Sequence, residues 1–182
     1  MGEVFVSVDL ETSGPNPRDY AILSIGACLV DDPEQSFYVE LKPTSDLALP
    51  AALAVSGLSM EELARTGTEP ELALRQFEDW LATLSGPPIF VAFNAAFDWM
   101  FIEDYFRRFL GSNPFGHSAL DIKAYAMGHT NSTWAATSMK FLSPRYLNGR
   151  PLEHNALSDA RDQAELFRAL RAEAASRTAS TP

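Results

Sequence analysis

The segment EVFVSVDLETSG, residues 3–14, alternates its side chains as a strand with one apolar face does. Successive strand residues point to opposite faces, so the aliphatic residues from Val4 to Leu10 fall on one side. Asp9 and Glu11 fall together on the other side, near the end of the strand. An exposed edge or turn would explain two such acids, but an inner strand gains little from them unless a cation compensates their charge. The segment predicts a core strand ending in two carboxylates that can share a metal ion.

Two further strands are expected close by. The apolar runs AILSIGACLV (residues 21–30) and SFYVELK (residues 36–42) lie on either side of the turn signal Asp31-Asp32-Pro33. The turn-rich stretch TSGPNPRDY (residues 12–20) precedes them. Three strands joined by such short turns predict an antiparallel meander.

The pattern becomes helical from Pro50. Ser59 with Glu62, and Thr68 with Glu71, have the spacing of a capping box, which predicts that helices begin there. After the next turn, the continuous apolar run IFVAF (residues 89–93) is typical of a strand covered on both faces.

Asn94 is expected to cap the helix that follows this strand and reaches about Leu110. A short strand or turn over residues 118–128 should then enter another helix, whereas residues 131–153 give no clear assignment. A final amphipathic helix is predicted from about Asn155 to Ala174. We expect one domain over residues 1–175 and a disordered C-terminal tail over residues 176–182.

Composition narrows the function classes. The chain has 182 residues, 46% of them apolar, which suits one globular core. Cys28 is the single cysteine, so no internal disulfide can form and a cytoplasmic setting is expected. No apolar run approaches the roughly 20 residues needed to cross a bilayer. The net charge of -10 argues against a broad surface for duplex DNA, because such binding depends on Lys and Arg, but it suits the binding of divalent cations.

Three later residues could join Asp9 and Glu11. Asp98 and Asp159 lie in the first turns of predicted helices, where the helix dipole alone favours a carboxylate by about 0.3–1 kcal/mol. His154, just before the last helix, could be an ordinary exposed residue. Taken together, four carboxylates from separate segments and a histidine are what two-metal hydrolysis of a phosphodiester requires. The imidazole can accept a proton from water near neutral pH.

Three motifs resemble those of one enzyme family, in the same order. VSVDLETSG (residues 6–14), FNAAFD (residues 93–98) and HNALSD (residues 154–159) are similar to the motifs of the DEDD exonucleases, and the last is that of the DEDDh branch. The resemblance covers roughly residues 3–170. It implies a ribonuclease-H-like α/β fold, in which helices flank a mixed five-stranded sheet built from an antiparallel meander and parallel strands.

The resemblance also implies chemistry. It assigns Asp9, Glu11, Asp98 and Asp159 as ligands of two Mg²⁺ or Mn²⁺ ions and His154 as the general base. The implied reaction is hydrolysis of single-stranded DNA or RNA from the 3′ end, which releases nucleoside 5′-monophosphates. A homodimer, or a polymerase or repair partner, is compatible with the same resemblance.

Substrate-binding residues are carried over from the same motifs. Thr12 is expected to meet the terminal nucleotide through its backbone, Leu58 in VSGLS to lie against the last bases, and Asn94 to contact the substrate. Ordinary loop and helix-cap roles are the alternative. The chain departs from many members of the family in having Ser13-Gly14-Pro15 after Thr12 and in having Phe93 where many have histidine.

Other readings stay open from the sequence. Basic residues before His154, interleaved with aromatic ones, could flank a nucleic-acid strand or simply form a solvated loop: Lys140, Arg145 and Arg150. The chain could also be a non-catalytic interaction module on the same fold, or a metal-dependent nucleotidase or phosphatase. Neither the choice between DNA and RNA nor the oligomeric state follows from any motif.

Overall fold

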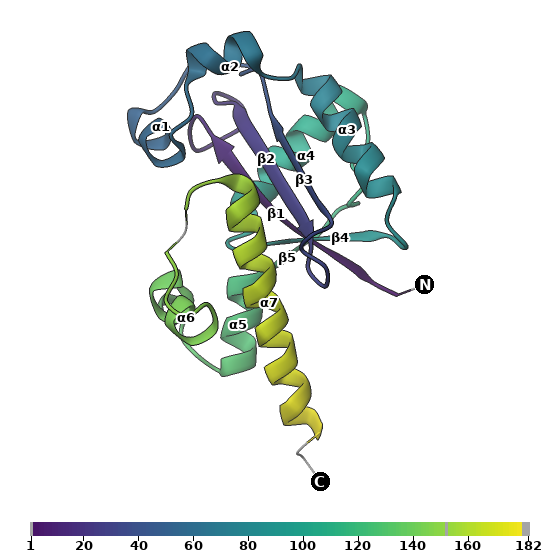
Figure 1. Cartoon of the computed structure of the whole chain (residues 1–182), viewed down its shortest axis with the longest axis vertical. Helices are drawn as coiled ribbons and strands as arrows, with labels where there is room; N and C mark the ends of the chain where they lie inside the picture. Colours follow the sequence, from purple (N-terminus) through teal and green to yellow (C-terminus); the bar gives the residue numbers. More distant parts are fainter. Residues whose placement is uncertain (1, 152, 180–182) are drawn as a thin grey trace.

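A computed structural model describes residues 2–151 and 153–179. Its centre is a mixed five-stranded sheet in the order β3-β2-β1-β4-β5 (Figure 1). β1 to β3 form the predicted antiparallel meander, whereas β1, β4 and β5 run parallel. The expected ribonuclease-H-like sheet is therefore confirmed. The strands are β1 (Val4–Thr12), β2 (Ile22–Leu29), β3 (Ser36–Glu40), β4 (Pro88–Ala92) and β5 (Ala119–Asp121).

Helices cover both faces of this sheet (Figure 1). α3 and α4 share one hydrophobic cluster with the apolar face of β1, and α5, α6 and α7 share a second cluster with residues of β2 and β4. No helix in the described ranges is long and apolar enough to cross a membrane. The helices are α1 (Pro50–Ser56), α2 (Met60–Thr66), α3 (Pro70–Ala82), α4 (Ala96–Leu110), α5 (Ile122–Thr130), α6 (Met139–Tyr146) and α7 (Ala156–Ala179), with a 3₁₀ turn at Trp134–Thr137.

The alternation along β1 sets which face carries the acids. Val6, Val8 and Leu10 are buried in the cluster with α3 and α4, as the pattern predicts. Residues that alternate with them point to the opposite face of the sheet, the one on which α7 packs. Asp9 and Glu11 therefore face the start of α7.

A glycine lets α7 begin close to those acids. Gly26 on β2 pairs with Asp9 in the β1–β2 ladder. A Cβ atom on Gly26 would lie 2.1 Å from the backbone carbonyl carbon of Ala156, the first residue of α7. Only glycine permits so close an approach of helix to strand. The missing side chain thus brings Asp159, about one turn into the helix, beside Asp9.

The helix starts test the capping predictions. Ser59 caps α2, since its Oγ accepts a hydrogen bond from the Glu62 N–H at 3.3 Å. The prediction at Thr68 is wrong. Its N–H donates to the Glu40 carbonyl at 2.8 Å, so Thr68 extends the sheet edge and α3 begins with Pro70.

The region without an assignment, residues 131–153, contains the 3₁₀ turn and α6. α7 runs past the predicted end at Ala174 and includes residues 176–179 of the expected tail. Residues 180–182 of that tail lie outside the described residues. The sequence underestimated α7 because its last turns lack the apolar spacing on which the prediction relied.

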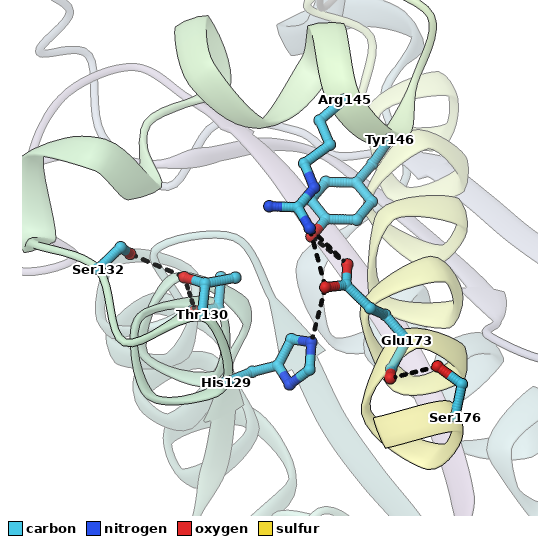
Figure 2. A network of polar contacts seen from close by, with 8 residues as sticks. His129, Thr130, Ser132, Arg145, Tyr146, Glu173 and Ser176 are labelled. Atoms are coloured by element: carbon cyan, nitrogen blue, oxygen red, sulfur yellow. Dashed lines mark hydrogen bonds and ion pairs between the residues drawn. The ribbon is translucent and has the colours of Figure 1, made fainter. Parts of the chain in front are cut away.

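A carboxylate on α7 fastens α6 to it. Glu173 accepts hydrogen bonds from Arg145 Nη2 at 2.8 and 2.9 Å and from Tyr146 Oη at 2.7 Å (Figure 2). His129 Nε2, from α5, lies 3.6 Å from a Glu173 oxygen. Three helices therefore meet at one acid, and α6 is held at the far end of the loop that carries His154.

Candidate active site

Three of the predicted metal ligands converge. Oxygens of Asp9, Glu11 and Asp159 lie within 4.8 Å of one another. The first two come from the end of β1, and Asp159 comes from α7 across the Gly26 contact. Segments about 150 residues apart in sequence thus form one acidic cluster, which we call the acidic site.

Asp98 lies next to this cluster but is oriented differently. Its Oδ1 accepts a hydrogen bond from the Leu10 N–H at 3.2 Å. β4 pairs only with Val4–Ser7 of β1, so the later N–H groups on that edge need another partner. Asp98 is buried, and after burial itself the charge of Glu11 also raises its pKa. The structure therefore brings Asp98 to the rim of the acidic site through the β1 backbone.

Gln163 is a member of the site that the sequence reasoning missed. It is buried, and its Nε2 donates to Asp9 Oδ1 at 2.6 Å while its Oε1 accepts the Phe93 N–H at 2.8 Å. Both ends of the amide are used, so its orientation is fixed. Its place four residues after Asp159, on the same face of α7, was the available signal.

Burial and crowding raise the pKa of every acid in the site. Burial raises the pKa of Glu11 to about 7, and the charge of Asp159 adds to the effect. Burial raises the pKa of Asp98 to about 8, although the backbone hydrogen bonds that it accepts act in the opposite direction. The pKa of Asp9 is raised well above its ordinary value, first by burial and then by the charges of the other three acids. Burial also raises the pKa of Asp159.

This arrangement suits bound divalent cations. Within residues 2–151 and 153–176, no Lys or Arg forms an ion pair with Asp9, Glu11, Asp98 or Asp159. A buried group of like charges is costly unless something positive compensates it. Oxygen ligands in this number are what Mg²⁺ and Mn²⁺ prefer. The site therefore has the donors and the uncompensated charge of a metal centre.

Arg145 and Arg150 are engaged elsewhere. Arg145 pairs with Glu173, as described above, and Arg150 Nη1 lies 3.3 Å from Asp162 Oδ1 and also contacts Glu165. These ion pairs fix α6 and the following loop to α7. They thereby restrain the loop that leads from α6 to His154.

His154 lies in the exposed loop just before α7. Its backbone has the left-handed value φ 55°, which is uncommon outside glycine and asparagine. The preceding Glu153 N–H donates to Asp159 Oδ1 at 3.0 Å, and Asn155 Oδ1 accepts the Ser158 N–H at 3.1 Å. His154 is close enough for its charge to lower the pKa of Asp159. The imidazole thus stands at the rim of the acidic site, exposed to solvent.

The predicted substrate residues Thr12 and Leu58 lie on different segments of the fold. Thr12 ends β1 directly after Glu11, and its Oγ1 donates to the Gly14 carbonyl at 3.0 Å. Leu58 is half-buried between α1 and α2 and packs against a small cluster that includes Leu63. Both substrate roles stay predictions.

Asn94 does not cap α4, so that part of its prediction is wrong. It adopts a left-handed backbone with φ 67°, and the helix begins at Ala96 without a capping side chain of its own. The carboxylate of Asp121 caps the start of α4 instead. Its Oδ2 accepts the Ala95 N–H and its Oδ1 accepts the Ala124 N–H, both at 2.6 Å. One carboxylate from the end of β5 thus serves the starts of both α4 and α5, which no local pattern could reveal.

Comparisons with known proteins agree with this geometry. The family model described as "Exonuclease" (RNase_T) matches residues 6–167. A protein of Escherichia coli named "3'-5' DNA exonuclease Cap18" is 46% identical over 169 residues, which cover 91% of this chain and 90% of that protein. "DNA polymerase III PolC-type" of Staphylococcus haemolyticus is 26% identical over 164 residues, 90% of this chain but 11% of the polymerase.

Solved structures show the same fold. The nuclease domain of 3'hExo, described as a DEDDh family member bound to rAMP, matches with a TM-score of 0.73 at 14% identity, over 93% of this chain and 92% of that one. E. coli Exonuclease I in complex with a dA16 oligonucleotide matches with a TM-score of 0.70 at 17% identity, over 97% of this chain and 43% of that one. From the fold, the acidic site, the family model and the 46% identical relative, it follows that the chain belongs to the DEDDh exonuclease family and is a 3′-5′ exonuclease.

Proposed function

We propose that this exonuclease acts on single-stranded DNA and uses two Mg²⁺ or Mn²⁺ ions held by Asp9, Glu11, Asp98 and Asp159. The single observation that carries the proposal is the convergence of three carboxylates within 4.8 Å. DNA is favoured because the 46% identical relative is named a DNA exonuclease. The net charge of -10 favours a short single-stranded segment over long duplex. The products are nucleoside 5′-monophosphates.

The protein's own groups divide the work. Asp9, held by Gln163, offers a carboxylate of fixed orientation between β1 and α7. Asp98, held by the Leu10 N–H, faces the same site from α4. Divalent ions bound there supply stabilisation of negative charge on the attacking and leaving oxygens. Positioning and electrostatic compensation are thus built on three separate elements of the fold.

His154 is the proposed general base. It removes a proton from the attacking water, and its exposed loop gives the proton a path to solvent. The His154→Ala variant should bind metal as the wild type does, measured by calorimetry, and lose most turnover. Wild-type turnover in this variant would remove His154 from the mechanism.

A labelled-oligonucleotide assay tests the whole proposal. A single-stranded 5′-labelled DNA should shorten from its 3′ end in Mg²⁺ or Mn²⁺, and the ladder should disappear with EDTA. Matched RNA added as competitor should slow the reaction less than the same DNA sequence does. Release of inorganic phosphate from mononucleotides, without a ladder, would instead support the nucleotidase alternative.

The remaining expectations belong to the same proposal. We expect residues 1–175 to act as one exonuclease domain in the cytoplasm, alone, as a homodimer, or with a polymerase or repair partner. Light scattering on the purified protein distinguishes monomer from dimer by mass.

A further inference from the structure

A cavity of about 450 Å³ lies between the start of α4, the end of β5 and the 3₁₀ turn. Small residues, among them Ala119 and Ala124, leave the space open, and its lining is mainly apolar. Its polar groups include Asn94 and His117, both exposed. The size and lining are those of a site for a small, flat organic group.

Two indole rings line this cavity. Trp99 on α4 is half-buried and packs edge-on against Phe90, with ring centroids 5.3 Å apart. Trp134 in the 3₁₀ turn is 49% exposed, and Lys123 Nζ lies 4.2 Å from its ring centroid. Lys123 is not among the residues that line the cavity, so it supports Trp134 without filling the space. A large aromatic surface is thus held in place and left partly uncovered.

The cavity is continuous with the catalytic elements. Asp121 lines it and also accepts the Ala95 N–H, three residues before Asp98. Asn94, held in its left-handed conformation, lines it directly ahead of the same helix. A group in the cavity therefore lies next to the helix start that carries Asp98. Thr12 and Leu58, expected to meet the terminal nucleotide, do not line it.

We propose that this cavity binds an unpaired base of the substrate strand upstream of the terminal nucleotide, against Trp134 and Trp99. The inference rests on the proposed function, which supplies a single strand with unpaired bases. Every base has a flat π face, so indole walls hold it without regard to sequence. Lys123 beside Trp134 adds a positive charge near the passing phosphates.

The test compares Trp134→Ala with Trp134→Phe and with Phe141→Ala. Phe141 is 54% exposed on α6 and does not line the cavity, so it is the matched control. Each variant is assayed on single-stranded DNA and on thymidine 5′-monophosphate p-nitrophenyl ester, which has no upstream base. Trp134→Ala should raise the ratio of the KM for DNA to the KM for the ester about 10-fold, and Trp134→Phe should restore most of it. An unchanged ratio in Trp134→Ala would overturn the proposal.

A binding measurement separates this idea from the proposed function. Ca²⁺ replaces Mg²⁺ to suppress turnover, and an oligonucleotide carries 2-aminopurine next to its 3′-terminal nucleotide. Wild type and Phe141→Ala should quench the probe by stacking, and Trp134→Ala should not. Quenching without cleavage in Mg²⁺ or Mn²⁺ would support the base site and reject the proposed reaction. Cleavage together with equal quenching in all variants would reject the base site and support the proposed reaction.

Discussion

The two ends of α7 surround carboxylate groups with opposite kinds of neighbour. Near its end, Glu173 accepts hydrogen bonds from Arg145 and Tyr146, and its Oε1 lies 3.6 Å from His129 Nε2 (Figure 2). Near its start, Asp159 meets two other carboxylates within 4.8 Å. The charge of the first acid is compensated by a cationic side chain of the protein, whereas no ion pair among the described residues brings Lys or Arg to the second cluster, in which the acids raise one another's pKa.

This difference separates a structural acid from a functional one. A carboxylate paired inside the fold stabilises it, because partner groups replace the lost water. Carboxylates that repel one another reduce stability and persist only where their charge is needed. Removing an acid should therefore raise the stability of the metal-free protein at the start of the helix and lower it near the end.

The largest effect is expected for Asp9→Asn. Turnover should fall on the order of 10³-fold or more, because the proposed metal centre loses a charged ligand. The melting temperature of the metal-free protein should rise, since Asn relieves repulsion among buried acids and can still accept from Gln163. Calorimetry measures the melting temperatures of the metal-free and the Mg²⁺-bound protein. A melting temperature lowered by several degrees without metal would show that Asp9 is instead a structural acid.

The second prediction concerns pH. Glu11 and Asp98 have pKa values of about 7 and 8 in the fold, against ordinary values of 4.5 and 3.8. As pH rises from about 4 to 8, the unfolded chain releases protons that the folded chain keeps, so metal-free stability should fall. The stability that these two raised pKa values contribute is fully present below about pH 4 and lost above about pH 8.

Urea unfolding at a series of pH values measures this fall. Saturating Mg²⁺ should remove most of it, because the cation stabilises the ionised acids. A stability that rises over the same pH range without metal would contradict the account.

A smaller effect is expected from Gln163→Leu. The variant keeps the volume of the side chain but frees Asp9 and the Phe93 N–H. Metal affinity or turnover should fall about 10- to 100-fold, as is typical when a group that orients a ligand is lost. Gln76→Leu, at an exposed position on α3, is the control and should match the wild type. Equal metal affinity and equal turnover in both variants would show that Asp9 needs no such support.

The smallest effect on activity is expected from Glu173→Gln. Loss of the charge weakens the Arg145 and Tyr146 contacts and should cost about 1–2 kcal/mol of stability. Glu71→Gln, which breaks an exposed pair with Arg75, should cost less than about 0.5 kcal/mol. Metal affinity should be unchanged in both. A Glu173→Gln variant that loses metal binding would mean that the two ends of α7 are not independent.

The sequence predicted what depends on local pattern. The alternation from Val4 to Leu10 identified the core strand and the face of Asp9, and three motifs in order indicated the family. These predictions are correct because the period of a strand and the order of motifs are properties of the sequence itself. The family and the fold could therefore be inferred almost completely.

Features that depend on contacts between distant segments were missed. Asp121 serves two helix starts, so Asn94 was wrongly given the capping role. Gln163 reaches Asp9 only because α7 packs closely on the sheet, an approach that Gly26 permits. Such roles follow from packing and leave no periodic signal.

Anomalous diffraction from a crystal soaked in MnCl₂ tests the central claim most directly. The account predicts two manganese peaks among Asp9, Glu11, Asp98 and Asp159, roughly 3.5–4 Å apart. No peak at this position at saturating manganese, or peaks only elsewhere on the surface, would contradict it.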